Sequence, residues 1–226
     1  MRSIVAALIG IAGLADAAAA QSPSRIELAP VARADKVFIE GGLSGTTPVA
    51  GVVATWRFTK ALGLEGEITR AANRMERSYE GWFISYNDDP DATREEIEAL
   101  APIARRTLGY EPGWGWAAAF VARGELSPRV TIAGRAGVAP RQYRETSDFV
   151  VLSIPEGVDP ARVARDFRST ARDKTRGGFL MGLDVGIALT NRVSVTPELR
   201  FVYSGPARIG NRHRELGVGV RAGWRF

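Results

Sequence analysis

Within the last thirteen residues of the chain, RELGVGVRAGWRF, the final eleven alternate strictly between two kinds of side chain. Even-numbered positions from Leu216 to Phe226 are apolar, whereas odd-numbered positions carry glycine or a charged residue. A period of two indicates a β-strand with one apolar and one polar face. Because exposed apolar surface is costly in water, the apolar face needs a partner. The alternation therefore restricts the chain to sheet architectures that cover one face of each strand.

The same alternation recurs along the chain in seven further segments of about ten to thirteen residues. The eight segments are 36–45, 49–59, 62–73, 113–123, 129–141, 178–190, 192–204 and 214–226. They are longer than the usual five or six residues of a soluble strand and long enough to cross a bilayer when tilted. The sequence therefore predicts an all-β fold, an eight-stranded antiparallel up-and-down transmembrane β-barrel with short periplasmic turns and two long extracellular loops.

The two long connections, 74–112 and 142–177, contain helical signals. Segment 91–106 has apolar residues at helical spacing, although Pro102 interrupts it. Asp159 is suited to cap a helix that begins with Pro160. We therefore expect short helices or ordered caps in these loops, and a short strand extension at 150–154.

The N-terminus has the pattern of a secretory signal peptide. Arg2 precedes an apolar stretch at 4–14, and three alanines at 18–20 offer a cleavage site near Ala20. The alternative, a helical membrane anchor, is disfavoured because the apolar stretch is too short. The chain is thus predicted to comprise a signal peptide at 1–20, a periplasmic N-terminal segment at 21–35, and an outer-membrane barrel domain at 36–226.

Alternation alone leaves open which face of the barrel points inward. A soluble lipocalin-like barrel would hold its apolar face inside, and a membrane barrel would turn that face to lipid. The interior of an eight-stranded barrel barely holds its own side chains, so filling it with tryptophan and phenylalanine would overpack it. Small residues and opposed charges fit better, and charges buried there need partners. The membrane alternative therefore predicts an interior polar cluster of Glu40, Arg57, Glu65, Glu67, Arg135, Asp184, Glu198, Arg200 and Arg221.

Within this cluster, Glu40 is a candidate partner for Arg221, because both are expected to point inward from neighbouring strands. The structural interpretation is that the pairs fill the barrel as a plug. The functional alternative is a small conductance that opens when the pairs rearrange.

The C-terminal strand, ending in GVGVRAGWRF, resembles that of the small bacterial outer-membrane β-barrels of the OmpA transmembrane-domain and OmpX type. The resemblance extends to the architecture of residues 36–226. It implies that Val220, Trp224 and Phe226 form a signal read by the outer-membrane barrel assembly machinery. It also implies a monomer surrounded by outer-membrane lipid and lipopolysaccharide, in a bacterial outer membrane.

Catalysis would need a nucleophile, a base and an orienting acid. His213, the single histidine, has Glu215 two residues on and Ser204 across a connection, so a Ser–His–Glu set is geometrically possible. No known motif surrounds it, and we predict a structural or surface-interaction role without enzymatic activity. A lipid-A-modifying enzyme remains an alternative.

No metal site or cofactor is predicted. The acidic segment 86–96 lacks the spacing and glycine of an EF-hand. The chain has a formal net charge of +5, but its arginines are scattered, and export argues against nucleic acid as a partner. Arginines at 162–176 are expected either to pair with the acidic segment or with lipopolysaccharide phosphates, or to form a solvated helix face together with Asp159, Asp166 and Asp173.

Overall fold

The computed structural model describes residues 25–39, 43–82, 101–204 and 213–225. These residues form an antiparallel sheet of eleven strands and one short helix. The elements are β1 (Arg25–Ile39), β2 (Leu43–Arg57), β3 (Leu62–Ala71), β4 (Met75–Trp82), β5 (Ile103–Ser127), β6 (Val130–Val138), β7 (Arg141–Ser153), α3 (Pro160–Asp166), β8 (Thr170–Arg176), β9 (Phe179–Ala188), β10 (Val193–Ser204) and β11 (His213–Arg225). The described part of the chain contains no helix with the length and apolar character needed to span a membrane.

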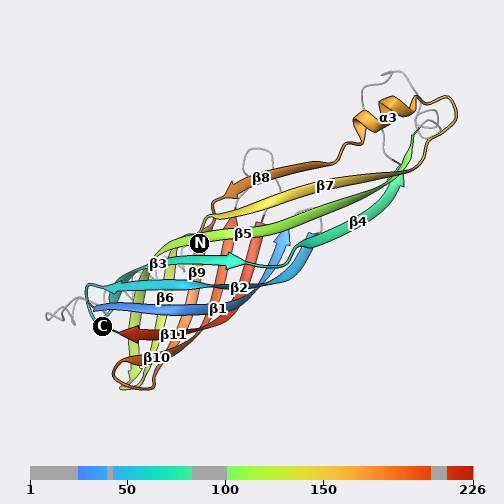
Figure 1. Ribbon diagram of the computed structural model, residues 1–226. Helices are drawn as coiled ribbons and strands as arrows, with labels where there is room; N and C mark the ends of the chain where they lie inside the picture. Colours follow the sequence, from blue (N-terminus) through green and yellow to red (C-terminus); the bar gives the residue numbers. More distant parts are fainter. Residues whose placement is uncertain (1–24, 40–42, 83–100, 205–212, 226) are drawn as a thin grey trace, which may run out of the picture. The chain divides into compact units, whose positions relative to one another are not determined.

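Eight of the strands form a closed ring in the order β3-β2-β1-β11-β10-β9-β6-β5. The pairing of β3 with β5, in which Ile68 lies opposite Trp116, closes the ring. The first and last strands of the chain, β1 and β11, lie side by side with Val31 opposite Arg221 (Figure 1). Because every ring strand has two neighbours, the ring leaves no edge strand unpaired.

The ring has two unlike ends. At one end, which we call the turn end, short connections join β2 to β3, β5 to β6 and β9 to β10. In each connection a side-chain hydroxyl accepts a hydrogen bond from a backbone N–H. Thr59 accepts from Leu62 at 2.8 Å, Ser127 accepts from Val130 at 3.1 Å, and Thr190 accepts from Val193 at 2.9 Å. At the other end, which we call the loop end, the connections that leave the ring include 72–111 and 142–178.

The first strand begins earlier than the alternation predicted. β1 starts at Arg25 rather than Lys36, so residues 25–35, expected to precede the barrel, form part of the ring wall. Residues 46–48, expected to form a connection, lie within β2. The predicted inner face of this strand was also wrong. An inward Glu40 would place Phe38 inside the ring, whereas Val37 is fully buried inside it and Phe38 is 44% exposed outside it. The sequence pattern failed because Pro30 and Pro48 lie within these strands, where proline is unusual.

The two long connections contain more strand than the sequence suggested. The described residues of 74–111 and 143–174 form a second compact unit, which contains β4, the first part of β5, and most of β7 and β8. In this unit, β4 pairs with β5 from Met75 opposite Tyr110 to Trp82 opposite Ile103. The helix expected across 91–106 is absent from its described end, because β5 begins at Ile103; residues 83–100 lie outside the described part.

The predicted helix start at Pro160 agrees with the structure. The carboxylate of Asp159 accepts the backbone N–H of Ala161 at 2.9 Å, and α3 follows directly. Phe167, at the end of α3, packs edge-on against Phe149 of β7 with ring centres 5.5 Å apart. The expected strand extension at 150–154 is also present, as the end of β7.

Candidate functional site

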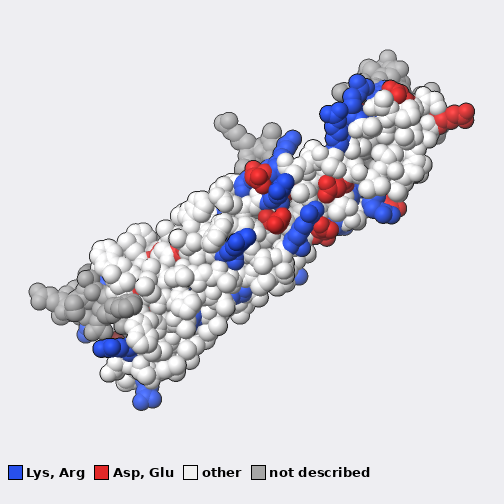
Figure 2. Space-filling view, in the orientation of Figure 1, with Lys and Arg blue, Asp and Glu red and all other residues white. Residues whose placement is uncertain are grey.

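The alternation along the ring strands separates two faces of opposite character. Charged side chains gather on the inner face, where Glu65, Glu67 and Arg135 are each at most 5% exposed. Large apolar side chains lie on the outer face, and much of the ring surface visible in Figure 2 is uncharged. Outer-face residues that are more than half exposed include Ile26, Val52, Ile68, Phe120, Val138, Leu183 and Val218. The polarity of a water-soluble protein is thus reversed, with charges inside and apolar groups outside.

Two arginines on opposite sides of the ring hold the centre of the inner cluster together. Arg135 of β6 contacts Glu65 of β3 at 2.7 Å and Asp184 of β9 at 3.1 Å. Arg221 of β11 contacts the same two carboxylates, at 2.6 and 2.5 Å. Each carboxylate is therefore shared by two guanidinium groups, which compensates the cost of removing these charges from water.

Glu198 of β10 joins this pair of arginines to a third. Its Oε2 accepts from Arg135 at 2.7 Å and lies 3.0 Å from Arg221 Nε, whereas its Oε1 accepts from Arg33 of β1 at 3.1 Å. Arg33 also contacts Asp35 at 2.6 Å and Glu67 at 3.2 Å. The ion pairs thus cross the ring in several directions and occupy its lumen.

The network continues towards the loop end. Glu67 also accepts a hydrogen bond from Arg200. Arg141, just after β6, lies 3.4 Å from Asp35 and 3.5 Å from Glu215. Glu215 in turn lies 3.2 Å from Nε2 of His213. His213 is therefore a buried member of the ion-pair network and not a solvated loop residue.

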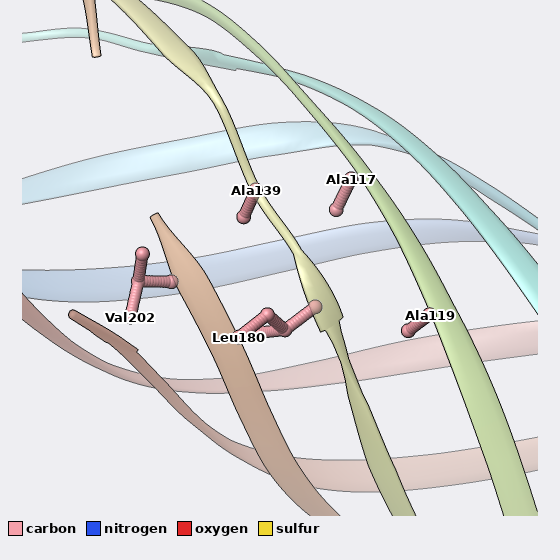
Figure 3. Close-up of a cluster of buried hydrophobic side chains, with 5 residues drawn as sticks. All are labelled: Ala117, Ala119, Ala139, Leu180 and Val202. Atoms are coloured by element: carbon pink, nitrogen blue, oxygen red, sulfur yellow. The ribbon is translucent and has the colours of Figure 1, made fainter. Parts of the chain in front are cut away.

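Small residues make room for the guanidinium groups. A Cβ at Gly182 would lie 2.4 Å from Nε of Arg135, and a Cβ at Gly217 would lie 2.7 Å from Cδ of Arg33. Beside the charges, small and apolar side chains fill part of the lumen. Figure 3 shows this cluster, which consists of Ala117, Ala119, Ala139, Leu180 and Val202. Alternation of small residues with arginine is what a narrow interior requires.

At the turn end the inner face opens into a cavity that is continuous with solvent. Its lining includes Glu27, Arg57 and Arg123, with Asp184 and Arg221 of the central network. Glu27 pairs with Arg57, and Arg123 donates to the hydroxyl of Thr131 at 2.7 Å. The cavity therefore ends at the ion pairs.

The structure places eight of the nine residues of the predicted polar cluster on the inner face. Seven are buried, and Arg57 is partly exposed at the turn end. Glu40 lies outside the described residues, and the described partners of Arg221 are Glu65, Asp184 and Glu198.

Sequence reasoning missed four further buried members of the network, namely Arg33, Asp35, Arg141 and Glu215. Arg33 and Asp35 were missed because the first strand was placed too late. The odd-numbered alternation from Val31 to Val37 would have revealed them if Pro30 had been accepted as a strand residue.

The other predicted sites have the following positions. Val220 and Trp224 lie on the outer face, 45% and 47% exposed, and Phe226 lies outside the described residues. Ser204 lies opposite His213 in the register of β10 and β11, and both side chains are buried.

Among the described residues, no three side chains of the usual ligand types come together as a metal site.

The fold and its interior define a closed eight-stranded antiparallel ring with a charged lumen and an apolar outer face. No known family profile matches the chain, and no curated protein matches it by sequence.

Solved structures provide similarity of fold. The attachment invasion locus protein Ail of Yersinia pestis aligns at 10% identity with a TM-score of 0.48, over 91% of this chain and 100% of that one. Neisserial surface protein A aligns at 17% identity with a TM-score of 0.49, over 87% and 95%. The outer membrane protease OmpT of Escherichia coli aligns at 10% identity with a TM-score of 0.40, over 90% and 96%. At such identities the similarity concerns the fold alone.

Proposed function

We propose that this protein is an integral outer-membrane β-barrel whose lumen is plugged by ion pairs and whose role is structural or surface interaction. The reversed polarity of the ring carries the proposal. Every ring strand turns apolar side chains outward, including residues as large as Trp56, Trp114 and Phe120. In lipid this face would be solvated favourably, and the closed ring would leave no backbone group unpaired.

A soluble ligand-binding barrel fits this interior poorly. Such a protein holds an apolar cavity inside and a polar surface outside. Here the lumen contains arginines and carboxylates bonded to one another, such as Arg33 with Glu67 and Arg135 with Glu65. A water-exposed outer face with Ile68 at 62% and Phe120 at 70% exposure would favour aggregation.

In the proposed orientation the turn end faces the periplasm, and the long connections that contain the strands of the second unit leave the ring on the extracellular side, where they would serve interaction. These connections then contain β4, β7, β8 and the first part of β5, besides the short helix that the sequence predicted. Their charged pairs, such as Arg105 with Glu80 and Lys174 with Glu145, suit a surface in contact with water. Monomeric state, cleavage near Ala20, and recognition of Val220, Trp224 and Phe226 by the assembly machinery remain parts of this proposal.

A small-conductance pore is the second candidate, and the cavity at the turn end favours it. This cavity reaches Asp184 and Arg221 of the ion-pair network, whose rearrangement would extend it into the lumen. Planar-bilayer recording would decide between plug and pore. The plug predicts no discrete openings in the native protein, and openings altered by Glu198→Ala would favour the pore.

Membrane fractionation tests the main proposal. The protein is expressed with its leader in a bacterium with two membranes, and inner and outer membranes are separated on a sucrose gradient. We expect it in the outer-membrane fraction, resistant to extraction with urea and migrating faster on gels before boiling than after. Recovery in the soluble periplasm would overturn the proposal.

A further inference from the structure

Charged side chains are rare on the outer face of the ring, and those present have one sign. Within the described ring strands, leaving aside the part of β5 that belongs to the second unit, they are Lys36 of β1, Arg70 of β3 and Arg214 of β11. The other outward positions carry apolar, small or uncharged residues, such as Ala34 and Val218 on the same strands. Outside that part of β5, which carries the exposed Glu111, no outward position of the described ring strands carries a carboxylate. This bias contrasts with the inner face, where both signs are mixed.

All three basic residues lie near the loop end. Lys36 is within four residues of the end of β1, Arg70 is the last residue but one of β3, and Arg214 is the second residue of β11. Lys36 lies opposite Leu216, and Arg214 lies opposite Phe38, so these two cations are diagonal neighbours on adjacent strands. The basic residues therefore mark the border at which the apolar band ends.

Aromatic rings accompany these cations. Nζ of Lys36 lies 5.9 Å from the centre of the Phe38 ring, and Cζ of Arg70 lies 5.6 Å from the centre of the Trp114 ring. Arg214 lies beside an aromatic residue on each neighbouring strand, Phe38 on one side and Tyr203 on the other. Aromatic residues and long cationic side chains favour the boundary between hydrocarbon and headgroups.

The three cations form no ion pair with any carboxylate that the structure describes. On the inner face, by contrast, Arg33, Arg135 and Arg221 each contact at least two carboxylates. The outer cations thus lie at the edge of an apolar surface, and no described carboxylate neutralises their charge.

We propose that Lys36, Arg70 and Arg214 form an outer-face site for the phosphate groups of a glycolipid in the leaflet at the loop end. The inference rests on the proposed membrane location. Phosphate oxygens accept charge-assisted hydrogen bonds from guanidinium and ammonium groups. The cations lie on β3, β1 and β11, and β2 separates β3 from β1 in the ring. This spacing suits a broad headgroup with more than one phosphate better than a phospholipid with a single one. Lipopolysaccharide has the required chemistry.

Binding of lipid A to the purified full-length mature protein in detergent tests the site. Bound lipid A is measured by native mass spectrometry for the wild type and for the triple variant Lys36→Gln, Arg70→Gln, Arg214→Gln. Because a cation near an anionic lipid surface contributes about 1 kcal/mol, we expect binding to weaken about fivefold for each charge removed. Dephosphorylated lipid A should bind the wild type as weakly as intact lipid A binds the triple variant.

A matched control removes the same charge from the other end. Lys60, Arg129 and Arg192 are exposed basic residues at the turn end, and changing all three to glutamine should leave lipid A binding unchanged. Equal loss in both triple variants, or loss in neither, would overturn the proposal. Equal binding of phosphatidylglycerol and lipid A would overturn the assignment to a glycolipid.

Gel migration before and after boiling checks that each variant folds. If the triple variant does not fold, the single variants are measured, each with an expected loss of about fivefold. Failure of the membrane proposal would appear separately, as soluble protein on fractionation. If the protein lies in the outer membrane but binds intact and dephosphorylated lipid A equally well, only this inference is overturned.

Discussion

Arg135 and Glu198, 63 positions apart in the sequence, are joined across the ring by a hydrogen bond of 2.7 Å between Nη2 and Oε2. Both side chains are completely removed from solvent. Glu198 also contacts Arg33 and Arg221, so one carboxylate links β10 to β1, β6 and β11. The stability of the ring should therefore depend on this pair more than on any exposed ion pair.

Replacing Arg135 with methionine should destabilise the protein strongly. The change leaves Glu65, Asp184 and Glu198 with less compensation in a buried position. Breaking a buried ion pair in this way costs about 3–5 kcal/mol of the free energy of unfolding. Urea-induced unfolding from lipid vesicles, followed by tryptophan fluorescence, measures it. The exposed Arg129→Met serves as control and should change stability by less than about 0.5 kcal/mol. Equal effects would show that the network contributes no specific stability.

A double-mutant cycle should reveal coupling between Arg135 and Glu198. Once Arg135→Met has broken the pair, Glu198→Gln should cost less than it does alone, because part of the interaction is already lost. The expected coupling is about 1–3 kcal/mol in the same unfolding measurement. Simple additivity of the two changes would contradict a direct interaction.

Gly182→Val should be much more damaging than the same change at Gly66. A Cβ at Gly182 would lie 2.4 Å from Nε of Arg135 and 3.1 Å from the carbonyl oxygen of Leu199, whereas a Cβ at Gly66 would meet no atom within 4 Å. Overpacking of this kind costs about 1–3 kcal/mol. The free energy of unfolding of the two variants provides the comparison, and a smaller loss at Gly182 than at Gly66 would contradict the packing described for the lumen.

An arginine in the middle of the outer face should be tolerated less well than one at the turn end. Leu183 lies in the middle of β9 and Leu189 just beyond its end, and they are 57% and 59% exposed. In a bilayer, Leu183→Arg should cost about 2–4 kcal/mol and Leu189→Arg about 0–1 kcal/mol. Unfolding from vesicles measures both. If the two variants were equally stable, the outer face would not be in contact with hydrocarbon.

His213→Ala should leave the mass of lipid A unchanged in cells that express the protein. His213 is 4% exposed and contacts Glu215, and Glu215 is shared with Arg141, so this set belongs to an ion-pair network. Mass spectrometry of extracted lipid A, with and without the gene and with the variant, provides the measurement. A modification that depends on the protein and disappears in His213→Ala would instead favour an enzyme.

The sequence by itself determined the strand periodicity and the side of most strands. Alternation from Leu64 to Thr69 and from Leu216 to Trp224 predicts which residues share a face, because successive side chains of a strand point to opposite sides. It therefore predicted an interior charge cluster that includes Glu65, Arg135 and Glu198. It failed where proline interrupted the pattern, at the start of β1.

Only the tertiary structure decided which charges meet. Periodicity gives each side chain a face but no partner across the ring, and the ring's closure and register bring Glu198 within reach of Arg33, Arg135 and Arg221. The second unit likewise depended on long-range pairing, since β4 and β7 each pair with β5, and β8 pairs with β7. Local propensity decides the extended conformation, whereas hydrogen bonds and ion pairs between distant segments decide the partners.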